Sequence, residues 1–352
     1  MRKNYLLVIA KIILFSIILT PIKGIAQVPT GYYGNANGLS GENLKTALYN
    51  IIKGHTEFSY TSSSTDVWDI LKETDRDPDN SENVILLYTG WSVNAAQEYN
   101  HGNGWTREHV WSKSHGDFGT SKGPGTDVHH LRPCDGSVNS AKNNKDFDEG
   151  GEEYFDNGIA TGCYSNSESW TWEPRDAVKG DVARMIFYMA VRYEGENGEP
   201  DLELVDYTFS SPNKEPLYGK KSTLLQWNID DPVDDWERNR NNIIYNDYQH
   251  NRNPFIDHPE YADAIWGTTT LAENTFINEQ LSLQLTTNIL KVKGQCDDNT
   301  ILMLFDMGGR MIISSDLNIE QEIHLNALKK GVYIVKLLSS NSVASKKISL
   351  MY

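Results

Sequence analysis

The sequence predicts an α+β protein, in which a mixed domain of helices and short strands is followed by a small all-β, sandwich-like domain. Apolar residues recur at helical spacing in segments 44–52 and 182–193, while 84–88 is a short apolar run typical of a buried strand. Beyond residue 267 the chain changes to short β-prone runs separated by turn residues. A length of 352 residues suggests about two domains, so we expect domains at 27–270 and 271–352.

The amino terminus is typical of a secretory signal over residues 1–26. Met1-Arg2-Lys3 precedes an apolar run from Leu6 to Leu19, and small residues follow at Gly24 and Ala26. This run falls short of the ~20 apolar residues that a membrane-spanning helix needs. We therefore expect an exported, secreted or cell-surface protein with no membrane span once the signal is removed.

Charge and cysteine content narrow the class of protein. A net charge of -16 argues against a simple cationic nucleic-acid binder, whereas an enzyme can offset repulsion with a divalent cation and a local groove. The three cysteines cannot build a disulfide framework, and no C-x-x-C pair indicates structural zinc. One bridge, Cys134–Cys163, is expected if the compartment oxidises thiols, which would leave Cys296 free.

Capping and turn residues place the remaining elements. Ser40 is suited to cap the first helix, Asp75 to Asn83 is a polar loop, and Asp181 precedes the second helix. Segment 229–266 is dense in Asp, Arg, Asn and aromatic residues. Its polar groups are candidates for a groove wall, but composition alone favours a solvated helix followed by a surface loop.

The strongest chemical pattern lies between Gly104 and Phe147. Glu108 and His109 are adjacent, and Asn139 follows on a short downstream helix. A carboxylate, an imidazole and an amide oxygen are the parts of a one-metal site for phosphodiester hydrolysis. In this hypothesis Glu108 and Asn139 hold one divalent ion, with Mg²⁺ preferred and Ca²⁺ or Mn²⁺ as alternatives, and neutral His109 is the general base that accepts a proton from the attacking water.

Adjacent residues on a strand do not easily serve one site, because successive side chains leave opposite faces. For Glu108 and His109 to act together, the backbone must twist locally or the site must wrap around the strand. Asp135 is placed to cap a helix from Val138 to Lys145, on which Asn139 would share a face with Asn143.

Other polar residues nearby have two interpretations. His129 and His130 would face oppositely on a strand, so at least one is expected to be a core or supporting residue. Arg132, Lys142 and Lys145 are candidates for phosphate contacts, and a solvated surface role is as well supported for each.

Three motifs together resemble the endonuclease I family of periplasmic and secreted nucleases: Arg107 to Trp111, Asp127 to Pro133 and Gly136 to Lys145. The resemblance continues through 236–241 and 249–261, and so covers roughly Gly31 to Trp266. It implies a ββα-metal (His-Me finger) core and cleavage of DNA, and often RNA, without sequence preference, leaving 5′-phosphate ends.

Motif positions assign the roles that the resemblance implies. His109 matches the family's base, Glu108 and Asn139 its metal ligands, His129 the histidine of the second strand and Asn144 the later helix asparagine. The full set of expected substrate-binding or supporting residues is Arg107, His129, Arg132, Lys142, Asn144, Gln249, Asn251 and Arg252.

The chain departs from the family pattern at two positions. No arginine lies between His109 and Asp127, where relatives place a phosphate clamp, so Lys113, Lys122 or Arg132 would have to replace it. Ser112 follows Trp111 where proline is usual.

The carboxyl-terminal region resembles the sorting domain of type IX secretion, through 302–310, 323–328, 331–336 and 346–348. This implies passage across the outer membrane by that machinery, followed by release or anchoring at the cell surface. A small β-sandwich that binds a ligand or carbohydrate is the alternative.

The sequence therefore predicts a secreted, metal-dependent, nonspecific endonuclease whose substrate is DNA and possibly RNA. Two other classes are kept as alternatives. One is a zinc-dependent hydrolase that uses His129, His130 and Cys134, and the other is a noncatalytic cell-surface binding protein.

Overall fold

The computed structural model describes residues 28–99 and 104–267, and beyond them 281–286, 289–294, 301–306, 310–316, 321–325, 328–329, 331–338 and 343–350. The predicted signal at 1–26 lies outside these residues, as does the predicted boundary near Leu271. Contacts divide the chain into two compact units, Met1–Gly267 and Thr268–Tyr352. No helix among the described residues is both long and apolar enough to cross a membrane.

The first unit begins with η1 (Gly34–Ala36), α1 (Gly41–Ile52) and α2 (Val67–Thr74). The helix expected after Ser40 is confirmed, with Leu44, Leu48 and Ile52 on its buried side. The strand expected at 84–88 is shorter, because β1 (Asn83–Ile85) pairs with β2 (Ser92–Asn94) and the buried residues after Ile85 leave the ladder.

The centre of interest is a strand pair followed directly by a helix. Strand β3 (Trp105–His109) runs antiparallel to β4 (Leu131–Asp135), and Glu108 lies opposite Arg132 in the register. Helix α3 (Gly136–Lys142) follows at once, because Asp135 accepts hydrogen bonds from the amides of Ser137 and Val138.

Two local expectations in this region are corrected. Helix α3 ends at Lys142 rather than Lys145, since Asn143 adopts φ 54° and leaves the helical path. Asn143 therefore does not share a helix face with Asn139. His129 and His130 lie in the turn before β4 rather than on a strand.

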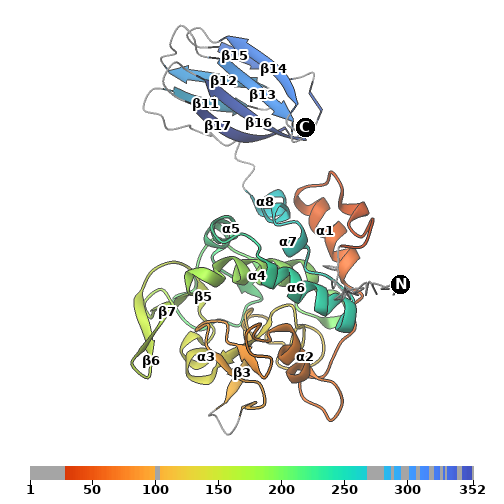
Figure 1. Ribbon diagram of the computed structural model, residues 1–352, viewed down its shortest axis with the longest axis vertical. Coiled ribbons are helices and arrows are strands. Elements are labelled where there is room, and N and C mark those ends of the chain that lie inside the picture. Colours follow the sequence, from red (N-terminus) through yellow and green to blue (C-terminus); the bar gives the residue numbers. More distant parts are fainter. Residues whose placement is uncertain are drawn as a thin grey trace, which may run out of the picture. The chain divides into compact units, whose positions relative to one another are not determined.

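A second sheet flanks this region. It is built from β5 (Asp146–Phe147), β6 (Glu152–Asp156), β7 (Ile159–Asn166) and β8 (Thr171–Glu173), in the order β5-β8-β7-β6. In Figure 1 the β6–β7 hairpin projects from the side of the unit. After η3 (Asp176–Val178), helix α4 (Lys179–Arg192) lies in the middle of the unit with α5 beside it, and it is buried from Gly180 to Arg192.

The rest of the unit is mainly helical: η4 (Glu196–Gly198), the parallel pair β9 (Glu203–Leu204) and β10 (Leu217–Tyr218), α5 (Lys221–Asp230), α6 (Asp235–Ile243), the π-helical turn η5 (Ile244–Tyr248), α7 (Pro254–Asp257) and α8 (Glu260–Trp266). The prediction that segment 229–266 is a solvated helix followed by a surface loop is wrong. Glu237 and Arg240 of α6 are buried, as are Gln249, Asn251, Arg252 and Asn253, whereas His250 is exposed.

The second unit is β-rich, as predicted. Strands β11 (Leu281–Thr286), β12 (Ile289–Gly294) and β15 (Gln321–His324) form one sheet; β14 (Met311–Asp316), β13 (Ile301–Asp306), β16 (Gly331–Leu338) and β17 (Val343–Leu350) form another, in that order. Leucines of β12 and β13 share one apolar core with Val335 and Ile348. Alternating burial along β13 matches the period of two that a half-buried strand requires.

Candidate active site

His109 is the last residue of β3 and is only 7% exposed. Its Nε2 lies 3.1 Å from the carbonyl oxygen of Gly125. A carbonyl can only accept, so Nε2 carries the proton and Nδ1 is left as the proton acceptor of the ring. The main chain thereby fixes the tautomer that a general base needs.

Gly125 can bring its carbonyl to His109 only because it has no side chain. A Cβ at this position would lie 2.7 Å from the carbonyl oxygen of Ser121 and 2.8 Å from that of Gly119. The preceding carbonyl, of Pro124, accepts from Nε2 of His130 at 2.8 Å. Two successive carbonyls thus hold two imidazoles whose ring centres are 5.6 Å apart.

The surroundings keep His109 uncharged. Burial, with a smaller contribution from His130, lowers the pKa of His109 well below its ordinary value. Burial also lowers the pKa of His130 to about 4, despite the opposing effect of Asp127. Near neutral pH both imidazoles are therefore unprotonated, which is the form that can accept a proton.

Glu108 points to the opposite face of β3 and meets different partners. Its Oε1 accepts from the hydroxyl of Tyr88 at 2.9 Å and lies 3.6 Å from Nζ of Lys142. The side chain is nearly fully buried, and burial raises the pKa of Glu108 above its ordinary value although Lys142 opposes the shift. Glu108 and His109 thus leave opposite faces of β3, as expected for successive residues of a strand.

Asn139 lies on helix α3, which packs against β3 and β4. It precedes Lys142 by three positions on α3, so the two share a helix face, and Lys142 reaches Glu108 from that face. Asn139 is half-buried, and no hydrogen bond to its side-chain amide occurs among the residues that the structure describes.

Lys142 is a buried supporting residue. Its Nζ donates to Ser112 Oγ at 2.6 Å and to the Tyr218 hydroxyl at 2.8 Å, besides its ion pair with Glu108. Ser112, where proline was expected, therefore supplies an acceptor that proline lacks. With its side chain fully enclosed, Lys142 contacts protein groups here rather than a phosphate.

Arg107 shares the His109 face of β3. Its guanidinium lies 3.4 Å from the ring centre of Tyr60 and 3.9 Å from that of Trp68, and it donates to the Tyr60 carbonyl and, at 3.2 Å, to Thr61 Oγ1. Arg107 therefore fastens the segment that contains Tyr60 to β3. The Tyr60 ring in turn stacks on His109, with ring centres 5.6 Å apart and planes 21° apart.

Asp127 is the hub of a buried polar network that the sequence did not reveal. Its carboxylate accepts from the hydroxyls of Tyr188 and Tyr193 and from Gln249 Nε2, and it lies 3.7 Å from His55 Nε2. Burial alone would raise the pKa of Asp127, but His55 and the other neighbours bring it well below its ordinary value.

Most of the other expected substrate-binding or supporting residues are buried in similar networks. Arg132 pairs with Asp75 and Asp181, Arg252 pairs with Asp257, and the rings of His129 and Tyr188 pack together, while His129 Nε2 meets Asn251. Asn144, half-buried, accepts from Trp170 through its amide oxygen and from His115 through its carbonyl. His129, Arg132, Asn144, Gln249, Asn251 and Arg252 thus contact other protein groups, as residues that support a site do.

The three described residues proposed as zinc ligands, His129, His130 and Cys134, do not converge on one point. His129 turns to Asn251 and His130 to Pro124, while Cys134 lies in the hydrophobic core. Cys134 and Cys163 are both free thiols, so the expected bridge between them is wrong; Cys296 lies outside the described residues.

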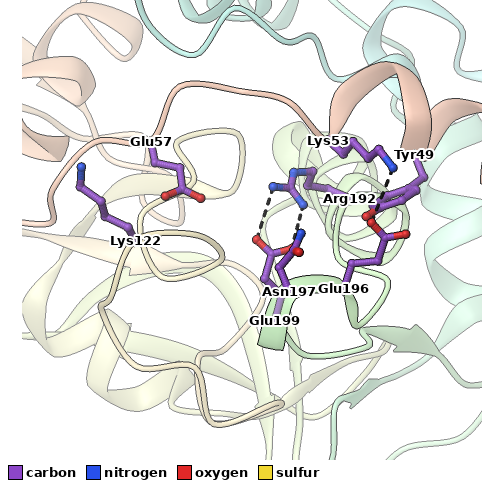
Figure 2. A pocket seen from close by; sticks show the side chains of 8 residues that line it. All are labelled: Tyr49, Lys53, Glu57, Lys122, Arg192, Glu196, Asn197 and Glu199. Carbon is purple, nitrogen blue, oxygen red and sulfur yellow. Dashed lines mark hydrogen bonds and ion pairs between the residues drawn. The ribbon is translucent and has the colours of Figure 1, made fainter.

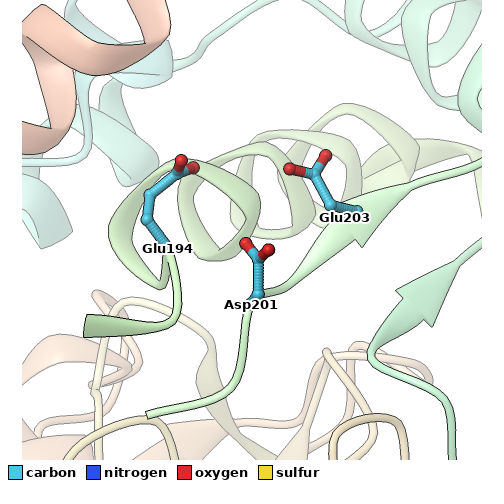
Figure 3. Close-up of side chains that lie close together, drawn as sticks. All are labelled: Glu194, Asp201 and Glu203. Atoms are coloured by element: carbon cyan, nitrogen blue, oxygen red, sulfur yellow. The ribbon is translucent and has the colours of Figure 1, made fainter. Parts of the chain in front are cut away.

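Three acidic side chains, Glu194, Asp201 and Glu203, converge away from these strands (Figure 3). The buried ammonium of Lys45 lies 2.7 Å from Glu194 and 2.5 Å from Glu203, so the cluster already contains a cation.

A surface hollow of about 510 Å³ lies near the loop that carries Gly125 and is lined by Tyr49, Lys53, Glu57, Lys122, Arg192, Glu196, Asn197 and Glu199. Figure 2 shows two pairs of opposite charges in it, Arg192 with Glu199 and Lys53 with Glu196. Lys122 thus belongs to this hollow.

Gly125 and Tyr60 were missed by sequence reasoning. The run Gly123-Pro124-Gly125 was a usable signal, because such a run marks a special turn. Tyr60 carried no such signal, since its contact with β3 joins residues far apart in the chain.

A neutral imidazole held by a carbonyl, and a buried carboxylate next to it in the chain, are groups that hydrolytic enzymes use. Comparison with known proteins gives the family: the Endonuclease I model matches residues 40–260, and the chain belongs to that family. It is a nuclease enzyme. The model for the secretion system C-terminal sorting domain matches residues 280–351, which confirms the predicted sorting domain and the extracellular destination.

Curated relatives agree with this family. An extracellular ribonuclease of Bacillus subtilis is 62% identical over 67% of this chain and 78% of its own length, and one of Bacillus amyloliquefaciens is 60% identical with the same coverage. Endonuclease-1 of Buchnera aphidicola is 27% identical over 37% of this chain and 46% of its own length. A DUF3244 protein of Bacteroides vulgatus with an immunoglobulin-like β-sandwich covers 20% of this chain and 83% of its own, at 12% identity and TM-score 0.19, a likeness too low to support an argument.

Proposed function

We propose that this protein is a divalent-metal-dependent endonuclease that hydrolyses phosphodiester bonds in RNA and DNA without sequence preference and leaves 5′-phosphate ends. The observation that carries the proposal is the pairing of His109 Nε2 with the Gly125 carbonyl, next to Glu108 on the other face of β3. The relatives named extracellular ribonucleases support RNA as a substrate, beside the DNA expected from the family motifs.

In this proposal His109 is the general base. Its Nδ1 takes a proton from the attacking water, while the Gly125 carbonyl holds the ring through the opposite nitrogen. Tyr60 and Phe118 pack on the imidazole, with ring centres 5.6 Å and 6.3 Å away, and limit its rotation. The lowered pKa keeps the base unprotonated before each turnover.

Glu108 and Asn139 fit a hard divalent cation such as Mg²⁺. Their carboxylate and amide oxygens are the ligand types that this ion prefers, and the Asn139 amide has no hydrogen-bond partner among the described residues. The ion, when bound, would stabilise negative charge that develops on the phosphate. Tyr88 and Lys142 hold the Glu108 carboxylate in place, and β3, β4 and α3 together would form the ββα-metal core.

Lys113 is the best replacement for the absent phosphate-clamping arginine. It is exposed, and its charge contributes to the lowered pKa of His109, so it lies within electrostatic reach of the base. Arg132 is enclosed by two carboxylates, and Lys122 lines the separate hollow.

We further propose that the type IX secretion machinery recognises the sorting domain and delivers the enzyme for release or surface anchoring. The match over residues 280–351 supports this route.

The direct test is cleavage of plasmid DNA and of a structured RNA by the purified full-length protein, with Mg²⁺ and with EDTA. We expect cutting of both polymers with Mg²⁺, none with EDTA, and 5′-phosphate ends on the products. Failure to cut either polymer with Mg²⁺, Mn²⁺ or Ca²⁺ would refute the proposal.

A further inference from the structure

Residues Thr61–Thr65, which we call the hydroxyl loop, form a continuous run of five hydroxyl side chains: Thr61, Ser62, Ser63, Ser64 and Thr65. All five are exposed, and Tyr60 immediately before them is half-buried against the candidate base. The proposed mechanism gives this loop no role.

The hydroxyl loop is tied to the catalytic strand. Arg107 stacks on Tyr60 and donates to the Tyr60 carbonyl and to Thr61 Oγ1. Since Arg107 and His109 leave the same face of β3, the ring of Tyr60 lies across both side chains. The loop therefore begins beside the imidazole that accepts the proton.

The loop is also held by hydrogen bonds within it and by a bridge at its base. Ser59 and Asp66 form a bridge at its base, and Asp66 Oδ2 accepts from the Ser62 amide at 2.8 Å. Ser62 Oγ donates to the Ser64 carbonyl at 2.7 Å. Because these contacts hold the loop in one shape, binding to it would lose little conformational entropy.

Four hydroxyl groups are left to donate outward. Thr61 Oγ1 accepts from Arg107, which leaves its own proton free. Ser63, Ser64 and Thr65 form no hydrogen bond through their hydroxyl groups among the described residues. Hydroxyl groups are common partners of phosphate oxygens in protein complexes with nucleic acids.

Charge explains why neutral donors suit this protein. A net charge of -16 disfavours a substrate grip that depends on charge attraction alone. Hydroxyl donors supply phosphate contacts that add no charge and release no counterions.

We propose that the hydroxyl loop binds nonbridging phosphate oxygens of the substrate strand next to the phosphodiester being cleaved, through the free hydroxyl groups of Thr61, Ser63, Ser64 and Thr65. This inference rests on the proposed function, and it names the way in which that site holds its substrate. The contact is to phosphate, which DNA and RNA share.

The test measures KM and kcat of the full-length protein on labelled single-stranded DNA and RNA of the same sequence, at several salt concentrations. The variant is T61V/S63A/T65V, which keeps Ser62 and its hydrogen bonds. The matched control is S210A/S211A, two exposed serines on the segment before β10. A second comparison is Lys113→Ala, which removes a cation beside the site.

We expect the loop variant to raise KM about tenfold or more on both polymers, with kcat changed much less, since each lost neutral hydrogen bond costs about threefold to tenfold. Its KM should keep the wild-type dependence on salt, whereas Lys113→Ala should flatten that dependence. The serine control should match the wild type.

An unchanged KM, a flattened salt dependence, or a loss confined to RNA would overturn the inference, the last because it would indicate a 2′-hydroxyl contact. If thermal melting shows that the triple variant is destabilised, Ser63→Ala alone should still raise KM about threefold. If the wild type cleaves neither polymer, the proposed function fails and this inference with it; if the wild type cleaves and the variant's KM is unchanged, this inference alone fails.

Discussion

The two faces of strand β3 differ sharply although they belong to adjacent residues. On one face His109 meets the rings of Tyr60, Phe118 and His130. On the other face Glu108 meets a tyrosine hydroxyl and a buried ammonium. Burial lowers the pKa of His109 on the first face and raises the pKa of Glu108 on the second. The strand thus places the proposed base and the proposed metal ligand in separate surroundings, which shift their pKa values in opposite directions.

The largest effect should come from His109→Ala. Removal of the general base is expected to lower kcat by about 10²- to 10⁴-fold. Single-turnover cleavage of RNA and DNA at saturating Mg²⁺ measures this loss. His324→Ala, an exposed histidine of the second unit, is the control. A rate within a few-fold of wild type would remove His109 from the role of base.

Gly125→Ala should weaken the hydrogen bond that orients His109 while leaving the His109 side chain itself unchanged. The new Cβ cannot fit beside the carbonyls of Ser121 and Gly119, so the Gly125 carbonyl must move away from the imidazole. We expect kcat to fall by about tenfold to a hundredfold, with the Mg²⁺ requirement unchanged. The control is Gly34→Ala, where a Cβ meets nothing within 4 Å. Wild-type kcat in Gly125→Ala would show that the carbonyl does not orient the base.

Stability should depend on pH through the buried imidazoles. The pKa values of His129 and His130 fall from the ordinary 6.5 to about 4, mainly through burial. Between these values the unfolded chain binds protons that the folded chain does not. Stability is therefore complete above about pH 6.5 and falls toward pH 4, by about 1.4 kcal/mol per pH unit for each group. Urea unfolding across this range tests the prediction, and a flat profile would contradict it.

The smallest effect is expected on the Glu108 face, from Tyr88→Phe. The change removes the hydrogen bond of 2.9 Å to Glu108 and keeps the fully buried ring. Loss of one hydrogen bond to a charged group should destabilise the fold by about 1.5 to 3 kcal/mol and raise the Mg²⁺ requirement a few-fold. Thermal melting and a Mg²⁺ titration of activity measure the two effects. An unchanged Mg²⁺ requirement would show that the Tyr88 hydroxyl does not help to position the Glu108 carboxylate for the ion.

Local rules predicted much of the fold around the site. Asp135 was expected to cap α3 and does so, whereas Ser40, expected to cap α1, occupies the N-cap position without a side-chain hydrogen bond to the helix. The end of α3 was missed, because a positive φ at Asn143 leaves no pattern in the sequence. The cap depends on residues two and three positions away, and such short-range contacts can be derived from sequence.

Long-range polar contacts explain what the sequence could not give. Arg240 is charged, and its helix has the composition of a solvated one, yet it donates to the carbonyls of Val128 and Leu131. Gln249 likewise bonds to the Val128 amide and to Asp127. These partners are more than a hundred positions away in the chain, so composition suggested a surface where the fold needed buried donors.

The most direct test of the division between the two faces is a Mg²⁺ titration of single-turnover cleavage by the wild type, His109→Ala, Glu108→Ala and Asn139→Ala. The account predicts that His109→Ala lowers the saturating rate and keeps the wild-type half-saturation point, whereas Glu108→Ala and Asn139→Ala shift half-saturation to higher Mg²⁺. A His109→Ala enzyme whose rate recovers at high Mg²⁺ would contradict the account, because it would make His109 a metal ligand rather than the base.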